Sequence, residues 1–280
     1  MRVFITGCKG QLGRALHETL TAHTVAGCDL PQTDITDRGA ITEAILDYAP
    51  HVVIHAAAWT DVDGCARDPG RAYRINALGT QNVALACAFA GAELVTISTN
   101  EVFDGQGEEP YHEWDTPCPV NPYGDSKAAA EWFTRHLLNR FYIIRTAWLY
   151  AAGGSNFPHR IIDLADELGR LSVVTDEVGN PTYAPDLAAA LAELIETHAY
   201  GVYHLTNAGH TSRYGFAREI LTLSGRKDVP VERITRDAFQ RDSTPPPFAP
   251  LANTAAAALD ICMRPWQEAL AAFLEESDGG

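Results

Sequence analysis

The chain is short of basic residues, of long apolar runs and of the cysteine and histidine spacings that bind metals. Lys and Arg number 21 against 36 Asp and Glu, which gives a formal net charge of −15. A surface of this sign repels nucleic acid and anionic membranes over a Debye length, about 8 Å at physiological salt. We therefore expect neither as a partner.

No uninterrupted apolar run approaches the ~20 residues that a membrane-spanning helix requires. The first residues, Arg2 to Thr6, predict a strand and do not have the layout of a signal peptide. These features predict a cytoplasmic protein. Hydrophobic residues make up 46% of the 280 residues, which is enough for a full core.

The six cysteines are scattered and include no Cys-x-x-Cys pair, which argues against a disulfide framework and against structural zinc. Among the ten histidines, His51 and His55 are the one pair with His-x-x-x-His spacing, and this pair falls in a predicted strand and not on a helix. His55 lies in an apolar run, and we expect it to be a hydrogen-bonded histidine at the edge of the core and not a ligand. We predict no metal site, although a dependence on Mg²⁺ stays open.

Apolar runs of strand length alternate with helical patterns through the first half of the chain. Strands with two apolar faces that are joined by helices indicate an α/β fold with a doubly wound parallel (Rossmann) sheet. The predicted strands are Arg2 to Thr6, Thr24 to Gly27, His51 to Ala56, Glu93 to Ser98 and Phe141 to Thr146, and the predicted helices are Gln11 to Leu20, Ala40 to Tyr48, Ala72 to Phe89 and Tyr123 to Leu138.

After about residue 150 the alternation is less regular. We predict a Rossmann domain over 1–155, joined by part of 180–206, and a smaller C-terminal region over 156–280. The later predicted helices are Asn156 to Leu168, Asp186 to His198, Tyr214 to Leu223 and Trp266 to Leu274, and the later predicted strands are Ser172 to Thr175 and Val202 to Thr206.

Three glycines, Gly7, Gly10 and Gly13, follow the first strand and open a helix. This is the context of a dinucleotide-binding loop, in which glycines permit a tight turn, a close approach to the pyrophosphate and close helix packing. The spacing is Gly-x-x-Gly-x-x-Gly and not the Gly-x-Gly-x-x-Gly of the classical dehydrogenases. The simpler alternative is a plain strand-to-helix turn.

Acidic residues after the second strand bear on which dinucleotide binds. Asp29 lies about twenty residues beyond the first glycine, where a carboxylate accepts from the adenosine ribose hydroxyls, and this favours NAD(H). The alternative is a turn aspartate, and Lys9 and Arg14 leave a 2′-phosphate open, so the cofactor is NAD or NADP. Asp34 and Ile35 are placed to reach the adenine, but this aspartate is equally well a turn or helix cap.

Tyr123 and Lys127 are four residues apart in a predicted helix, so both side chains lie on one face. There the ammonium group of Lys127 is expected to lower the pKa of the Tyr123 phenol from its usual ~10 and make it a proton donor. Thr99, at the end of the fourth strand, would hydrogen-bond the same substrate oxygen. Tyr-x-x-x-Lys alone occurs by chance in many helices, and the glycine loop and Thr99 make the interpretation specific.

Together these motifs resemble an extended short-chain dehydrogenase/reductase. Longer stretches are similar to the dTDP-4-dehydrorhamnose reductase family, from near residue 1 to about 270. The matching stretches are Gly10 to Gly13, His55 to Asp63, Ala72 to Ala77, Val102 to Gly105, Asn121 to Gly124, Arg145 to Trp148 and Val178 to Leu187.

The resemblance implies reduction of the C4 ketone of dTDP-4-dehydro-6-deoxy-L-mannose to dTDP-L-rhamnose, with NADH or NADPH as cofactor. It implies that 1–155 binds NAD(P) and that 156–280 mainly binds substrate, and it leaves a homodimer open. The implied cofactor-binding residues are Gly7, Gly10, Gln11, Leu12, Gly13, Asp29, Asp34, Ile35, Ala56, Ala57, Ala58, Asn76 and Lys127. The implied substrate-binding residues are Thr60, Val62, Thr99, Glu101, Tyr123, Trp148, Asn180, Thr182 and Asn253, and the catalytic residues are Thr99, Tyr123 and Lys127.

The sequence departs from the family pattern at three places. Asn100 and Glu101 stand where the family usually has Asp and Tyr. The segment that ends in Asn253 lacks an arginine that the family commonly carries, and Arg213 and Arg241 are candidates to replace it. Glu177 stands where Gln is usual.

These departures keep other functions open. The second hypothesis is a reductase of a different nucleotide-linked or free keto-sugar. The third is a non-catalytic regulatory subunit similar to the methionine adenosyltransferase β subunit, which the intact Thr99, Tyr123 and Lys127 disfavour. An epimerase that retains its NAD ranks last.

Overall fold

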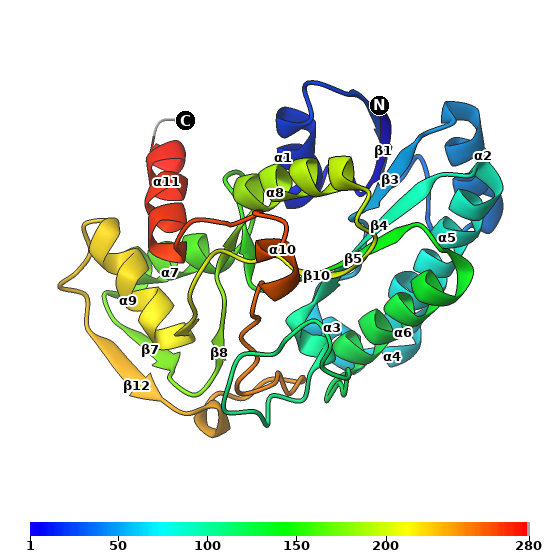
Figure 1. Cartoon of the computed structure of the whole chain (residues 1–280). Coiled ribbons are helices and arrows are strands. Elements are labelled where there is room, and N and C mark those ends of the chain that lie inside the picture. Colours follow the sequence, from blue (N-terminus) through cyan, green and yellow to red (C-terminus); the bar gives the residue numbers. More distant parts are fainter. Residues whose placement is uncertain (279–280) are drawn as a thin grey trace.

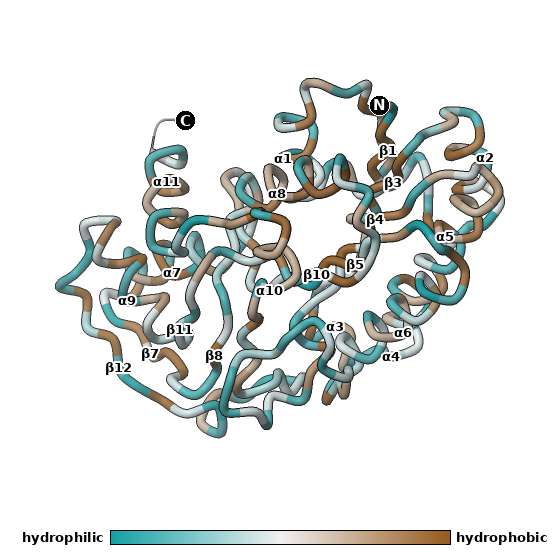
Figure 2. The backbone as a smooth tube through the Cα atoms, in the orientation of Figure 1, coloured by the Kyte–Doolittle hydropathy of each residue, from teal (hydrophilic) through white to brown (hydrophobic). Residues whose placement is uncertain are grey.

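The computed structural model describes residues 1–278, and its larger part is built on a six-stranded parallel sheet (Figure 1). The spatial order is β10-β5-β4-β3-β1-β2, and every pairing is parallel. Apolar residues follow these strands through the centre of the molecule (Figure 2). The strands are β1 Arg2–Thr6, β2 Thr24–Cys28, β3 Val52–His55, β4 Glu93–Thr99, β5 Phe141–Thr146 and β10 Gly201–His204.

Helices cover both faces of this sheet (Figure 1). On one face α1 (Gln11–Thr19) contacts α8 (Ala184–Thr197), and both contribute to one apolar core. On the other face α2 (Arg38–Tyr48) packs against α5 (Gly79–Ala90), which packs against α6 (Pro122–Leu137). The predicted doubly wound α/β sheet is therefore confirmed.

The strand order reverses beside β1, which lies between β2 and β3. The chain runs from β1 outward to β2, then crosses back to β3 on the other side. Ligands of such sheets bind at this switch point, beyond the carboxyl ends of the strands. Gly7 follows β1 and Ala56 follows β3, so the two segments flank the place where a ligand is expected.

The helical segment before α5 is less regular than predicted. The sequence predicts one helix from Ala72, but the chain forms α4 (Pro69–Ala72), a π-helical turn η1 (Tyr73–Leu78) and then α5. The predicted start was wrong because Asp68 accepts from the Arg71 amide and caps an earlier turn. A further helix, α3 (Val62–Arg67), precedes it and was not predicted.

A second, smaller core joins the C-terminal elements. Phe216 and Phe273 are fully buried in it, beside Trp266 and Tyr150. The helices around this core are α7 Phe157–Leu168, α9 Arg213–Leu223 and α11 Trp266–Asp278, and the parallel strands β7 Leu171–Val174 and β12 Val231–Ile234 lie beside them. This part lies apart from the large sheet in Figure 1.

The remaining elements are short. They are β6 Leu149–Tyr150, β8 Val178–Gly179, β9 Thr182–Tyr183, β11 Thr211–Ser212, the 3₁₀ turns η2 Asn100–Val102 and η3 Arg236–Ala238, and α10 Thr254–Ala257. None of these was predicted, because two to four residues carry no readable periodicity. The long predicted strands and helices, in contrast, match the structure to within about two residues at most of their ends. Across residues 1–278, no helix combines the length and the apolar character needed to cross a bilayer.

Candidate active site

The glycine loop forms the tight turn between β1 and α1. Gly7 has φ +73°, and a Cβ placed there would lie 2.7 Å from the amide nitrogen of Ala57. A Cβ on Gly13 would lie 2.3 Å from the carbonyl oxygen of Gly7. Both positions therefore require glycine. Gly10 caps α1 without a side-chain hydrogen bond, so the first amides of this helix are available to an anion.

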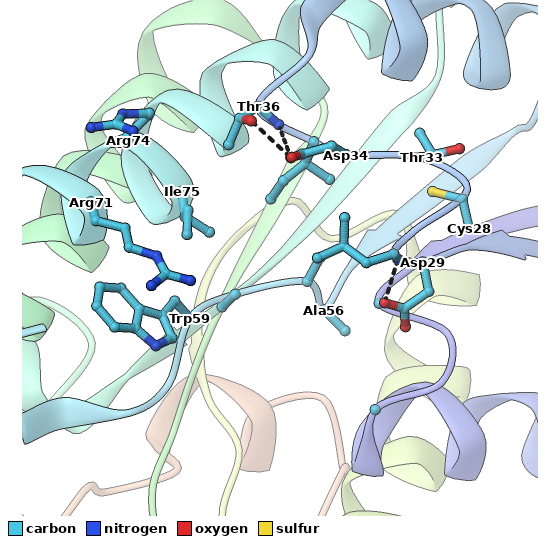
Figure 3. Close-up of a pocket in the computed structure, with 16 residues that line it drawn as sticks. Cys28, Asp29, Thr33, Asp34, Thr36, Ala56, Trp59, Arg71, Arg74 and Ile75 are labelled. Carbon is cyan, nitrogen blue, oxygen red and sulfur yellow. Dashed lines mark hydrogen bonds between the residues drawn. The ribbon is translucent and has the colours of Figure 1, made fainter. Parts of the chain in front are cut away.

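A cavity of about 500 Å³ opens beside this loop (Figure 3). Asp29 lies in its wall and accepts hydrogen bonds from the amides of Lys9 and Leu30, each at 2.8 Å. Asp34 accepts from the amide and the hydroxyl of Thr36, also at 2.8 Å. Both aspartates organise turns, as one of the two alternatives predicted, and both also line the cavity, while contact with the adenosine stays a prediction. Ile35, Ala56, Ala57 and Ala58 complete the predicted part of the lining.

Arginines that the sequence did not single out lie across this cavity. The guanidinium carbon of Arg71 lies 4.5 Å from the centre of the Trp59 ring, and Arg74 is close by (Figure 3). Both come from the irregular helical segment 69–78, and Arg71 belongs to none of the stretches that carry the family resemblance. No sequence pattern therefore identifies Arg71 as a candidate site residue; only its position in the cavity lining does.

Asn76 joins the cofactor side of the site to α6. Its side chain accepts from the amide of Trp59 at 2.8 Å and donates to the carbonyl of Trp59 at 3.0 Å. It also donates to the hydroxyl of Ser126 at 3.0 Å, and Ser126 in turn donates to the carbonyl of Tyr123. Asn76 therefore acts by fixing two segments of the wall, and it is not in the cavity lining.

A second cavity, of about 610 Å³, shares the glycine loop, Ala56 and Ala58 with the first. Thr99 at the end of β4 and the pair Tyr123 and Lys127 on α6 lie in its wall. The Thr99 hydroxyl hydrogen-bonds the Tyr123 phenol. The fold therefore brings all three predicted catalytic residues to one place. Gln11, Leu12, Thr60, Val62, Glu101 and Trp148 line the same cavity, as does Gly13.

The predicted lowering of the Tyr123 pKa was wrong. The pKa of Tyr123 is raised above its usual 10, first because the phenol is desolvated and then because the Glu101 carboxylate lies near it. The hydrogen bond from Thr99 offsets part of this. Burial lowers the pKa of Lys127 to about 8, and Glu131 opposes that shift.

His55 has the structural role that was predicted for it. Its Nδ1 lies 2.7 Å from the Thr6 hydroxyl and its Nε2 lies 3.0 Å from the Thr80 hydroxyl, in a fully buried position. Burial, and secondarily the Lys127 charge, lowers the pKa of His55 to about 3. It is a neutral histidine that connects β1, β3 and α5.

A buried ion pair between β5 and α6 was not predicted. Arg145 on β5 donates to both carboxylate oxygens of Glu131 on α6, at 2.9 and 2.8 Å, and Ser98 donates to the same carboxylate at 2.6 Å. Arg145 is 0% exposed and the Glu131 side chain 3%. Glu131 lies one helical turn after Lys127, so the ion pair anchors the helix that carries Tyr123 and Lys127, the predicted catalytic residues.

Trp148 and Arg213 form the side of the second cavity that faces the C-terminal region. The guanidinium carbon of Arg213 lies 3.7 Å from the Trp148 ring centre, and Arg213 also lies 3.8 Å from a carboxylate oxygen of Glu177. Arg241, the other candidate for the missing arginine, pairs with Asp63 at 3.0 Å and is outside this lining.

Three predicted substrate contacts are not brought to the cavity. Asn180 is buried, donates to the carbonyl of Gly209 and accepts from the amide of Leu251. Thr182 is fully buried, and Asn253 exchanges hydrogen bonds with Thr206. Their polar groups are used inside the protein, where they join β8, β9 and the C-terminal loop. Across residues 1–278, no cluster of three or more His, Cys, Asp or Glu side chains is arranged to hold a metal ion.

Comparison with known proteins matches the whole described chain to one family. The model of the RmlD substrate binding domain matches residues 1–278. The spore coat polysaccharide biosynthesis protein SpsK of Bacillus subtilis is 36% identical over 277 residues, which cover 98% of this chain and 97% of that protein. A dTDP-4-dehydrorhamnose reductase of Streptomyces griseus is 37% identical over 279 residues, which cover 96% of this chain and 91% of that protein. The crystal structure of dTDP-4-dehydrorhamnose reductase from Bacillus anthracis in complex with NADP has a TM-score of 0.95 at 38% identity and covers 98% of this chain and 99% of that one.

Proposed function

The chain belongs to the RmlD substrate binding domain family, and we propose that it is an NAD(P)H-dependent reductase of the C4 ketone of dTDP-4-dehydro-6-deoxy-L-mannose, with dTDP-L-rhamnose as product. The observation that carries this proposal is the continuity of the two cavities. The glycine loop, Ala56 and Ala58 belong to both, so a dinucleotide lying along them extends from Asp29 to Tyr123.

The residues present fit a bound NAD(P). The close approaches at Gly7 and Gly13 leave no space for a side chain, and the uncapped N-terminus of α1 favours the pyrophosphate. Asp29 would hold the adenosine ribose, and Asp34 and Ile35 would lie near the adenine. When bound, the reduced nicotinamide supplies the hydride that the substrate C4 accepts.

Tyr123 would give its phenolic proton to the oxygen on C4 as the hydride arrives at the carbon, so the ketone becomes an alcohol. The raised pKa keeps Tyr123 protonated at neutral pH, which is the state that a proton donor needs. Thr99 would hydrogen-bond the same oxygen and then the phenolate that remains. Lys127, with a pKa of about 8, carries a positive charge near neutrality and would stabilise that phenolate and hold the nicotinamide ribose.

The test is oxidation of NADH and NADPH by the purified protein, with the keto-sugar generated in situ from dTDP-glucose. We expect turnover by the wild type and a loss of several orders of magnitude in kcat for Tyr123→Phe, with cofactor binding retained. Tyr48→Phe is the matched control, because the Tyr48 hydroxyl donates to the Thr24 carbonyl away from the cavity. Near-normal turnover of Tyr123→Phe would overturn the assignment of the proton donor.

A reductase of a different keto-sugar is the second candidate. It is favoured by the carboxylate of Glu101 in the wall that would contact the sugar. Turnover of only a non-dTDP keto-sugar would establish it. A regulatory subunit would bind cofactor but reduce no keto-sugar, and an epimerase would convert a nucleotide sugar without net consumption of NADH or NADPH.

A further inference from the structure

Glu101 is an unusual group to find beside a carbonyl-reducing site. It lies in the 3₁₀ turn η2 directly after Thr99, and its side chain lines the second cavity together with Tyr123 and Arg213. The position is constrained, because a Cβ on Gly124 would lie 2.0 Å from the carbonyl oxygen of Glu101. The turn therefore packs directly against the start of α6, next to Tyr123, and leaves no space for a side chain at position 124.

Only one of the two carboxylate oxygens is used within the protein. Oε2 accepts from the side-chain amide of Asn121 at 2.6 Å, and Asn121 in turn caps α6. Among residues 1–278, Oε1 has no hydrogen-bond partner. Burial raises the pKa of Glu101 and Glu177 adds to this, while the hydrogen bond from Asn121 and the charges of Arg213 and Arg241 oppose the shift. Arg213 itself is held by Trp148 and Glu177.

An acceptor without a protein partner in the wall of a cavity can accept a hydrogen bond from a bound ligand. If Thr99 and Tyr123 hold the reacting carbonyl oxygen, Glu101, which lies two residues after Thr99 in the same wall, would lie beside the ring atoms next to that carbonyl. In a 6-deoxy sugar with a ketone at C4, C5 carries a methyl group, which donates no hydrogen bond, and C3 carries the hydroxyl. The C3 hydroxyl is therefore the donor that matches the free oxygen.

We propose that Oε1 of Glu101 accepts a hydrogen bond from the C3 hydroxyl of the substrate, and that this contact makes the protein select 4-keto sugars with a free hydroxyl beside the ketone. The inference rests on the proposed function and narrows its substrate class. A sugar without this hydroxyl leaves a desolvated carboxylate oxygen unpaired, which sites of this kind reject more strongly than they reject a change in apolar volume.

The experiment compares two substrates, the dTDP-linked 4-keto-6-deoxy sugar and its 3-deoxy analogue. We expect wild-type kcat/KM to favour the 3-hydroxy sugar by about 10- to 100-fold, the range typical of a hydrogen bond to a charged group. Glu101→Ala should bring the ratio of the two values near unity. Glu101→Gln should leave a preference of only a few-fold, since the amide keeps the size of the side chain and loses its charge.

The matched control is Glu109→Gln, which removes the same charge from an exposed position in the same connecting segment. We expect it to keep the wild-type preference. Equal kcat/KM for the two sugars in the wild type would overturn the inference, and so would an unchanged ratio in Glu101→Ala. The ratio of wild-type kcat/KM for the two sugars tests the inference even if a Glu101 variant does not fold. If the wild type reduces neither sugar, the proposed function itself fails, which is a different result from equal reduction of both.

Discussion

Substitution of the buried Arg145 should destabilise the protein far more than substitution of the partly exposed Arg135. Two arginines contact Glu131. Arg145 on β5 makes a bidentate ion pair with the carboxylate. Arg135 on α6 has a guanidinium nitrogen 3.6 Å from a carboxylate oxygen, and 41% of its side chain is exposed. The same carboxylate thus has one partner in the interior and one in solvent.

The expected magnitudes follow from burial. Arg145→Met leaves Glu131 in a desolvated position without its bidentate partner, although Ser98, the partly exposed Arg135 and the charge of Lys127 stay near it, and breaking a buried pair in this way costs about 3–5 kcal/mol. Arg135→Met removes a weaker pair whose arginine is partly exposed to solvent, and pairs screened in this way are worth about 0–1 kcal/mol. A loss of the first size is a large part of the roughly 5–15 kcal/mol that stabilises a typical protein.

The assay is urea unfolding followed by circular dichroism, with the free energy of unfolding extrapolated to water. The double variant Glu131→Leu with Arg145→Met should recover much of the loss, because it leaves no unpaired buried charge. Equal effects of Arg145→Met and Arg135→Met would refute the reasoning. A double variant as unstable as Arg145→Met would show that packing, and not the unpaired charge, causes the loss.

Three further predictions concern cofactor binding and pH. Asp29→Ala should weaken NADH binding and relatively improve the use of NADPH, because the carboxylate suits a ribose hydroxyl and repels a 2′-phosphate; fluorescence titration with both cofactors measures this, and an unchanged preference would show that another residue sets it. Gly13→Ala should abolish cofactor binding while the protein stays folded, since the new Cβ would lie 2.3 Å from the Gly7 carbonyl oxygen; tight binding in that variant would contradict the close packing of α1. The kcat/KM should fall as pH rises through about 8, because Lys127 is protonated below its pKa of about 8 and loses its charge above it; a profile that stays flat until exposed lysines titrate would show that the charge of Lys127 is not needed.

The sequence by itself determined the sheet, the glycine loop and the placement of Tyr123 and Lys127, the predicted catalytic pair. Each of these features depends on residues that are close together in the sequence. The sheet follows from apolar runs of strand length, and the loop follows from a turn that requires glycine at Gly7 and Gly13. The four-residue step puts Tyr123 and Lys127 on one helix face. Local sterics and periodicity act over a few residues, so a single sequence, without an alignment, is sufficient to predict these features. The resemblance to a reductase family rests on the same local stretches.

Only the tertiary structure decided the electrostatics of the site and the partners of its polar groups. The pKa of Tyr123 rises because the phenol is desolvated beside Glu101, and both causes depend on packing between β4 and α6. The pair of Glu131 and Arg145 and the stacking of Arg213 on Trp148 join residues 14 and 65 positions apart. Asn180, Thr182 and Asn253 match the family pattern, yet their hydrogen bonds are satisfied inside the protein. Burial and pairing are properties of what surrounds a side chain, and those surroundings exist only once distant parts of the chain have come together.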